Sequence, residues 1–298
     1  TGRLLEEKTT EADSQGEWKL AFSARKGSYD VYRIVVTLEE TQMVIDDVLI
    51  GELWIAGGQS NMELTVSTDM DAEAMVTDAD DNYLRMFLEP TWPYGRGGDQ
   101  PYEPAKDVPG AYWGYGDNGA QVGKVSSVAY TFAKKLRKEL NVPIGIINTA
   151  VGGTIIETWI SKEAIEEDSR VKDALKQYGL YRSDQEWPAV TGGEMSTLYN
   201  QKIGPLEGMN IAGVIWYQGE SNEDRAEIYD IELNLLKESW SRVFHFEAGD
   251  MPFIFTQRAP YQSATVPYNE YYPYLAESME RAWSMNRDRA TAMLTIYD

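Results

Sequence analysis

The sequence has 298 residues, of which 43% are hydrophobic and 25% charged, and its formal net charge is −21 at pH 7. This composition is typical of a globular protein that is large enough to bury a full core, and it excludes a disordered chain. An acidic surface repels phosphate backbones and anionic lipids, and no apolar run approaches the ~20 residues that span a bilayer, so neither nucleic acid nor membrane insertion is expected.

The N-terminal segment, up to about residue 48, has the pattern of short β-strands. Three runs, at 17–25, 30–38 and 42–46, are rich in β-branched and aromatic residues and partly alternate. They predict antiparallel strands, too few to close a sheet. Because no signal-peptide pattern precedes Thr1 and the chain lacks an initiating Met, we expect residue 1 to be an interior position of a longer protein.

Beyond residue 48, short apolar runs alternate with amphipathic stretches. The apolar runs are at 52–57, 83–89, 143–150, 211–218, 252–257 and 292–297. The helical patterns lie near 125–140, 161–178, 195–203, 226–244 and 270–285. Strands that alternate with helices predict an α/β fold with a parallel sheet covered on both faces. We therefore expect a β remnant over 1–48 and one α/β domain over 49–298.

The first helical pattern shows how a helix would pack on this sheet. Val128, Phe132, Leu136 and Leu140 fall on one stripe, with lysines opposite. Asn141 ends the pattern, and a proline two residues later begins the next strand. The stripe predicts the face of the helix that contacts the sheet.

The stretch from 90 to 123 is crowded with proline, glycine and aromatic residues. A loop of this length in a compact domain is usually functional, and its aromatic rings would suit stacking on sugars. A surface loop packed by its own aromatic side chains is an equally open interpretation. The aromatic residues in question are Trp92, Tyr94, Tyr112, Trp113 and Tyr115.

Glycine beside polar side chains follows three of the predicted strands. The segments are "GGQSN" at 57–61, "NTAVGGTIIETW" at 148–159 and "QGESN" at 218–222. The carboxyl ends of parallel strands meet at one edge of a sheet, where ligands bind. The three segments therefore predict a single site.

The chemistry that suits such a site is acyl transfer through a serine. Ser60 stands where a strand gives way to a helix, close to backbone N–H groups not yet engaged in helical bonds. A tetrahedral intermediate needs two or three donors aimed at one oxygen, for which Ser60 N–H, Gly153 N–H and the Gln218 amide are candidates. Taken singly, each turn could be structural: Ser60 could cap a helix, and Glu220 could complement a helix dipole.

Together, "GGQSNMEL", "AVGGTIIETW" and "VIWYQGESN" resemble the sialate O-acetylesterase family of carbohydrate acetylesterases, within the SGNH hydrolase superfamily. The likeness runs in order from about residue 40 to the C-terminus, and residues 1–48 resemble the last strands of a β domain that often precedes the catalytic domain. The resemblance implies a flavodoxin-like α/β/α three-layer sandwich with a central parallel sheet. It also implies a serine hydrolase without metal or cofactor, and an acetylated carbohydrate as substrate.

By motif match, the resemblance implies Ser60 as nucleophile, with Gly153 and Gln218 as oxyanion donors. It also implies a set of substrate-binding residues around the nucleophile: Gln59, Asn61, Glu220, Asn222 and, from the aromatic stretch, Trp113. The turn at Ser60 is not the G-x-S-x-G elbow of α/β-hydrolases, because the residue two positions after the serine is a methionine.

The sequence departs from the family pattern in its histidines. The sequence has no cysteine and one histidine, which excludes disulfides, thiolate metal sites and a zinc cluster. His245 falls at the end of an amphipathic helix, before a strand whose other end forms the functional edge. This position predicts a structural role.

The family carries an Asp-x-x-His pair after the last strand, and this sequence has none. Two explanations stay open. In the first, the sequence is part of a longer protein whose pair follows residue 298, and Asp298 belongs to the strand end. In the second, the protein is an inactive relative that binds acetylated glycans through its aromatic loop.

Substrate identity lies in loops whose shape the sequence does not give, so sialic acid, xylan and other acetylated sugars all remain compatible. The oligomeric state is not predicted. A location outside the cytoplasm, secreted or periplasmic, is expected only because esterases that act on glycans tend to work there.

Overall fold

The computed structural model describes residues 2–97, 100–187, 190–247, 249–260, 272–287 and 289–296. The chain divides into two compact units, Thr1–Gly51 and Glu52–Asp298, each with its own contacts. In the described part of the chain, no helix combines the length and the apolar character needed to cross a bilayer.

The first unit contains a two-stranded antiparallel sheet of β1 (Ser28–Leu38) and β2 (Thr41–Ile50). These strands confirm the predictions at 30–38 and 42–46. The predicted strand at 17–25 is wrong, because that run has no ladder partner. Side chains hold it instead: the Glu6 carboxylate accepts a hydrogen bond from Ser23 N–H at 3.0 Å and pairs with Arg25 at 2.9 Å.

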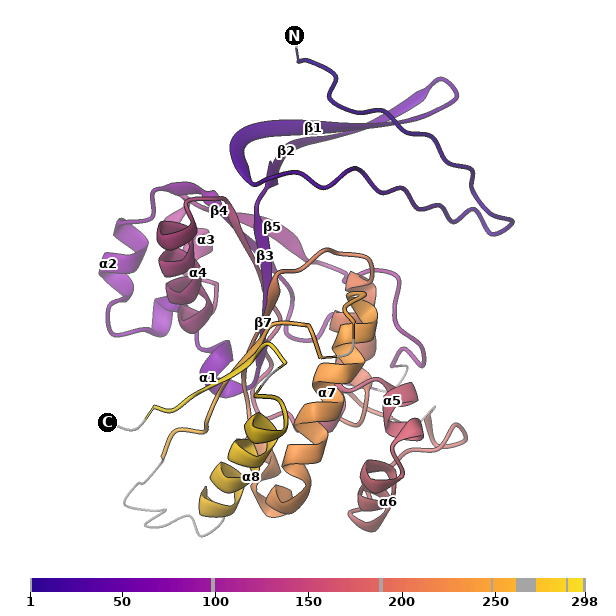
Figure 1. The fold of residues 1–298 in the computed structure, drawn as a ribbon, viewed down its shortest axis with the longest axis vertical. Coiled ribbons are helices and arrows are strands. Elements are labelled where there is room, and N and C mark those ends of the chain that lie inside the picture. Colours follow the sequence, from indigo (N-terminus) through magenta and orange to yellow (C-terminus); the bar gives the residue numbers. More distant parts are fainter. Residues whose placement is uncertain are drawn as a thin grey trace. The chain divides into compact units, whose positions relative to one another are not determined.

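The second unit is built on a sheet that, among the described residues, has seven strands in the order β5-β4-β6-β3-β7-β8-β9 (Figure 1). All neighbours are parallel except β4 and β5. The strands are β3 (Glu52–Gly58), β4 (Asp81–Leu88), β5 (Tyr112–Gly116), β6 (Ile144–Asn148), β7 (Gly213–Tyr217), β8 (Phe253–Thr256) and β9 (Thr291–Leu294). The six predicted apolar runs form the six parallel strands. The edge strand β5 was not predicted, because it lies within the stretch interpreted as a loop.

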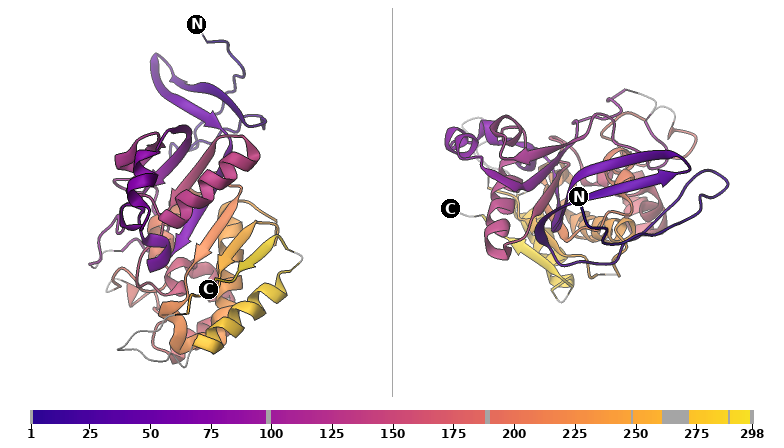
Figure 2. Two further views of the ribbon diagram at one scale, coloured as in Figure 1. Left: turned by 90° about the vertical axis from the view of Figure 1, so that its left-hand side faces the viewer. Right: turned by 90° about the horizontal axis from the view of Figure 1, so that it is seen from above.

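Helices cover both faces of this sheet (Figures 1 and 2). One face is covered mainly by α4 (Ser127–Leu140), and α2 (Ala72–Thr77) and α3 (Gly119–Val122) lie on the same side. The other face is covered by α5 (Lys162–Glu167), α6 (Ser169–Gln177), α7 (Tyr229–Val243) and α8 (Tyr272–Met285). Short helical segments follow the strands: α1 (Ser60–Glu63), η1 (Val66–Thr68), η2 (Ile156–Trp159), η4 (Tyr199–Ile203), η5 (Gly204–Leu206) and η6 (Glu220–Ile228).

Alternation along the strands divides the core into two layers. In β3, Trp54 and Ala56 join the cluster under α4, whereas Ile55 joins the cluster under α7 and α8. In β7, Trp216 faces α7 and packs edge to face with Trp240 at 5.6 Å between ring centroids. Successive residues of a strand point to opposite faces, so a strand covered on both faces is apolar throughout. The predicted three-layer α/β/α architecture is confirmed.

Helix α4 confirms half of the predicted stripe: Phe132 and Leu136 pack against the core, and Phe132 lies edge to face with Trp54 of β3 at 5.1 Å between ring centroids. Ala129, Tyr130 and Ala133 are buried, whereas Val128 is 39% exposed and Leu140 is 43% exposed. The fully buried face of the helix thus includes the two alanines, and the end members of the predicted stripe, Val128 and Leu140, are exposed. Asn141 ends the helix in a left-handed conformation, as predicted.

The strand order brings three loops together. β3 lies between β6 and β7, so the chain leaves β3 toward one side of the sheet and later returns on the other. In the flavodoxin order the first strand lies between the second and the third, which would put β3 between β4 and β6, whereas here β3 lies between β6 and β7. The carboxyl ends of β3, β6 and β7 are consequently adjacent, at the point where parallel sheets bind ligands.

Candidate active site

Ser60 begins α1 directly after β3, and it is exposed. A tight contact with β7 fixes the turn before it. Gly58 has φ +141°, and a Cβ atom there would lie 2.1 Å from the carbonyl oxygen of Tyr217, so only glycine fits. Gln59 N–H donates to the same carbonyl oxygen at 2.9 Å. The backbone therefore presents the serine hydroxyl at the surface, beside β7.

The loop after β6 approaches Ser60 through Gly152 and Gly153. Val151 N–H donates to the carbonyl oxygen of Gly58 at 3.0 Å, which fixes this loop to the serine turn. A Cβ atom added to Gly152 would lie 3.6 Å from Ser60 Oγ. Gly153 adopts φ +70° with open space around it. Two of the predicted segments thus meet at the serine.

Two backbone donors at this junction are unused. Among the described residues, neither Ser60 N–H nor Gly153 N–H has a hydrogen-bond acceptor. Helix α1 has only four residues, so the helix dipole invoked from the sequence contributes little, and the N–H groups themselves are the relevant donors. Unused backbone N–H groups are the donors that a developing oxyanion requires.

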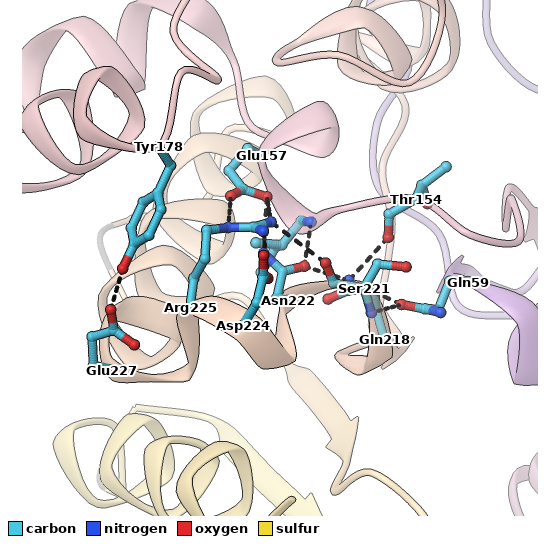
Figure 3. A network of polar contacts seen from close by, with 11 residues as sticks. Gln59, Thr154, Glu157, Tyr178, Gln218, Ser221, Asn222, Asp224, Arg225 and Glu227 are labelled. Atoms are coloured by element: carbon cyan, nitrogen blue, oxygen red, sulfur yellow. Dashed lines mark hydrogen bonds and ion pairs between the residues drawn. The ribbon is translucent and has the colours of Figure 1, made fainter. Parts of the chain in front are cut away.

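Gln218, the third predicted donor, is fully buried and already engaged (Figure 3). Its Nε2 atom lies within hydrogen-bond distance of Gln59 Oε1 (3.1 Å), Thr154 O (3.0 Å) and Asn222 Oδ1 (2.8 Å). Its Oε1 atom accepts a hydrogen bond from the Tyr229 hydroxyl at 2.7 Å. An amide has two N–H groups, so no hydrogen is left for an oxyanion in this arrangement. The side chain instead joins the three loops of the site.

A buried ionic network lies behind Gln218 (Figure 3). The Glu157 carboxylate, which is fully buried, accepts hydrogen bonds from Asn222 Nδ2 at 2.9 Å and from Arg225 Nε at 3.1 Å. Asn222 Oδ1 also accepts one from Ile156 N–H at 2.9 Å. Burial raises the pKa of the adjoining Glu232 carboxyl well above its usual value, and the Glu157 carboxylate raises it further. These contacts fasten the loop after β7 to the loop after β6.

The sequence singled out Asn222 but missed Arg225 and Glu232. Arg225 could have been found from its position, because it follows Asn222, the last residue of "QGESN", by one helical turn. Glu232 lies inside an amphipathic helix, where a glutamate normally indicates a solvent-facing position, so nothing in the sequence distinguished it.

The predicted substrate-binding residues divide into two groups. Gln59 and Asn222 are buried in the network, with 3% and 0% exposure. Asn61 and Glu220 are partly exposed next to the serine, and Asn61 Nδ2 donates to Glu220 Oε1 at 3.0 Å. Glu220 Oε2 is buried without a partner among the described residues, and burial raises the pKa of this carboxyl. Asn61 and Glu220 are thus the members of the set that a ligand can reach.

Trp113 lies elsewhere. It is on the edge strand β5, packed against Phe87 with 5.2 Å between ring centroids. Two strands separate β5 from β3, which corresponds to about 14 Å across the sheet at ~4.8 Å per strand. The structure does not bring Trp113 to Ser60. With the exposed Tyr115, two positions along the strand, it forms a separate aromatic surface on one face of β5, whereas the exposed Tyr112 points to the opposite face.

His245 lies where the sequence analysis expected it. It follows α7 in a left-handed conformation with φ +57°, is exposed, and precedes β8. It is therefore at the amino-terminal edge of the sheet, opposite Ser60. The described residues contain no group of three or more His, Cys, Asp and Glu side chains arranged to hold a metal ion.

Comparisons with known proteins identify relatives. The sequence profile of the family described as "carbohydrate esterase, sialic acid-specific acetylesterase" matches residues 50–273. Sialate O-acetylesterase from Mus musculus is 30% identical over 246 residues, which are 73% of this chain and 44% of that protein. The Homo sapiens protein of the same name is 31% identical over 222 residues, 70% of this chain and 39% of that protein.

A crystal structure of a carbohydrate acetylesterase from Xanthomonas citri is similar to the whole chain. The TM-score is 0.77 at 29% sequence identity, and the match covers 96% of this chain and 59% of that one. This chain thus spans less than half the length of the curated relatives named above.

Proposed function

The chain belongs to the sialic acid-specific acetylesterase family of carbohydrate esterases, and we propose that the protein removes acetyl groups from sugar hydroxyls through a serine acyl-enzyme. One observation carries the proposal. An exposed Ser60 lies beside Gly152 and Gly153, and two backbone N–H groups there are without acceptors in the described part of the chain. This arrangement suits acyl transfer and has no evident structural purpose.

In the proposed reaction, Ser60 Oγ attacks the acetyl carbonyl carbon. The carbonyl oxygen becomes an oxyanion that accepts hydrogen bonds from Ser60 N–H and Gly153 N–H. Collapse of this intermediate breaks the bond to the sugar oxygen, which takes up the proton that the base removed from Ser60 and leaves as a hydroxyl, and acetyl-Ser60 remains. Water then hydrolyses the acetyl-enzyme to acetate. We assign Gln218 a positioning role, since its amide hydrogens are engaged.

The reaction needs a base for the proton of Ser60. His245 lies at the opposite edge of the sheet and does not fill this role. We propose that the Asp-x-x-His pair of the family pattern serves in the full protein. β9 is parallel to β8, so a segment that follows it leaves the sheet at the same edge as Ser60. β9 is three strand positions from β3, about 14 Å across the sheet, so the segment must cross the ends of β8 and β7 to bring a histidine to the serine.

Substrate contacts are proposed for Asn61 and Glu220, the two partly exposed polar residues next to Ser60. The hydrogen bond from Asn61 Nδ2 to Glu220 Oε1 holds the two side chains together beside the serine. The identity of the acetylated sugar and a location outside the cytoplasm stay predictions.

A second candidate function is glycan binding without catalysis. It is favoured by the aromatic surface on β5, where Trp113 and Tyr115 are exposed on the same face of the strand. Such rings stack on sugars, and the surface lies away from the serine.

The deciding experiment compares hydrolysis of 4-nitrophenyl acetate and of an acetylated sugar by the full protein and by its Ser60→Ala variant. We expect turnover to fall by at least about 10³-fold in Ser60→Ala with an unchanged thermal unfolding curve. Ser67→Ala, on the nearby η1 segment and also exposed, is the matched control and should keep full activity. No hydrolysis by the unmodified protein, or equal hydrolysis by Ser60→Ala, would favour the binding function or another nucleophile.

A further inference from the structure

The geometry points to Glu63 as a positioning residue of the oxyanion site, an inference that rests on the proposed esterase function. Glu63 is the last residue of α1, the short helix that Ser60 begins. Its Oε2 atom accepts a hydrogen bond from Gly152 N–H at 2.8 Å. The nucleophile and the loop that carries the Gly153 donor are thereby joined by one side chain.

Glu63 and Gly152 fit each other closely. A Cβ atom on Gly152 would lie 2.5 Å from Glu63 Oε2, well inside van der Waals contact. The carboxylate thus occupies the space that any larger residue at position 152 would need. Since the same Cβ position is 3.6 Å from Ser60 Oγ, this contact is made directly beside the nucleophile.

The rest of the loop is fixed on either side of the two glycines. Val151 is held by the backbone of Gly58, and Thr154 Oγ1 donates to the carbonyl oxygen of Val151 at 2.7 Å. Between these anchors, Glu63 provides the one hydrogen bond recorded for the N–H groups of Gly152 and Gly153 in the described chain. Two consecutive glycines have wide conformational freedom, and this bond fixes the peptide unit directly before the one that carries the Gly153 N–H.

The bond also selects which donor remains available. Gly152 N–H points to the carboxylate, and Gly153 N–H is left without an acceptor among the described residues. The hydrogen bond and the charge of Glu63 have opposite effects on the proposed reaction. The bond places the donor, whereas a negative charge so near disfavours an oxyanion. The hydrogen-bond acceptor of Glu63 and the length of its side chain therefore favour the reaction, and its charge does not.

Three substitutions separate these properties. Glu63→Gln keeps an acceptor oxygen at the same reach and removes the charge. Glu63→Asp keeps the charge but is one methylene too short, and Glu63→Ala removes both. Glu73→Ala deletes a similar charge from an exposed position on α2 and is the control.

We expect Glu63→Asp and Glu63→Ala to lower kcat about 10- to 100-fold with KM changed less than about threefold, because a displaced donor weakens transition-state binding and not substrate binding. Glu63→Gln should keep kcat within about threefold of the unmodified protein or raise it, and Glu73→Ala should leave both constants unchanged. Unchanged kcat in Glu63→Asp and Glu63→Ala would overturn the inference. So would a loss in Glu63→Gln equal to that in Glu63→Ala.

Amide hydrogen exchange gives a readout that does not need activity. Gly152 N–H should be protected in the unmodified protein and in Glu63→Gln, and should exchange faster in Glu63→Asp. Equal protection in all three would overturn the inference. Hydrogen exchange can be measured whether or not the protein is active. Absent hydrolysis by the unmodified protein would therefore contradict the esterase proposal alone, and the exchange result would still test the role of Glu63.

Discussion

Gln218 Nε2 donates to Gln59 Oε1 at 3.1 Å, so the residue that precedes the nucleophile is bonded to the loop after β7. The same nitrogen also lies 3.0 Å from the carbonyl oxygen of Thr154, in the loop after β6. One buried amide therefore touches all three segments whose motifs identified the site. The geometry of the proposed active site depends on this contact.

Gln218→Ala should lower the stability of the protein as well as its rate. Removal of the amide leaves the oxygen atoms of Gln59, Thr154 and Asn222 without this donor, which costs about 1–3 kcal/mol per buried group left unsatisfied. We expect kcat to fall about 10²-fold through misplacement of Ser60. Urea unfolding and steady-state kinetics of the same preparations provide the test. A loss of kcat without any loss of stability would instead indicate that Gln218 donates directly to the oxyanion.

Arg225 should be among the most costly charged residues to remove. Its side chain is 6% exposed and pairs with the fully buried Glu157 carboxylate. Arg225→Ala leaves that carboxylate without its cation, which typically costs about 3–5 kcal/mol. Arg170→Ala is the matched control, because Arg170 also pairs with a carboxylate, that of Asp168, but its side chain is 68% exposed. An exposed ion pair contributes less than ~1 kcal/mol to the free energy of unfolding. Comparable losses of unfolding free energy in the two variants would contradict the role of the network.

Stability should fall in alkali because of buried tyrosines. Burial raises the pKa of Tyr199 to about 12 and that of Tyr217 to about 12. Between pH 10 and 12, the folded protein therefore holds protons that the unfolded chain has lost, and the free energy of unfolding falls as pH rises through this range. Below pH 10 both states are protonated at these groups, and the contribution is fully present. Urea unfolding at pH 9, 10 and 11 measures the slope, which Tyr199→Phe should reduce. An unchanged slope in Tyr199→Phe would exclude this tyrosine as a cause.

The parallel sheet was predictable because its signal is local. Runs such as 211–218 are apolar throughout, which indicates a strand covered on both faces. The meeting of the three motifs then follows from topology, since the carboxyl ends of β3, β6 and β7 share an edge. Edge elements were less predictable. β5 has five residues, two of which are glycine, so its sequence resembles a loop. The run 17–25 has the residue types of a strand, but it pairs with no other strand.

The division of labour within the site was not predictable from sequence. The motif places Gln218 near Ser60, but whether its amide faces an oxyanion or a protein carbonyl is decided by distances to Thr154 and Asn222. Trp113 shows the reverse case, in which a residue type suited to sugars lies on a strand remote from the nucleophile. The type of a residue indicates which interactions its side chain can make. Only its neighbours in the structure show which of its hydrogen-bonding groups are already engaged.

The bonds from Gln218 to Gln59 and from Asn61 to Glu220 each span 159 positions along the chain. After the ribosome has added Ser60 to the chain, it must therefore add most of the second unit before Gln218 and Glu220 are synthesised. The nascent polypeptide carries the serine for much of its synthesis without the surroundings that would activate it. The proposed hydrolytic activity therefore arises only late in synthesis, and its loss would report partial unfolding of the second unit sooner than a change in helix content.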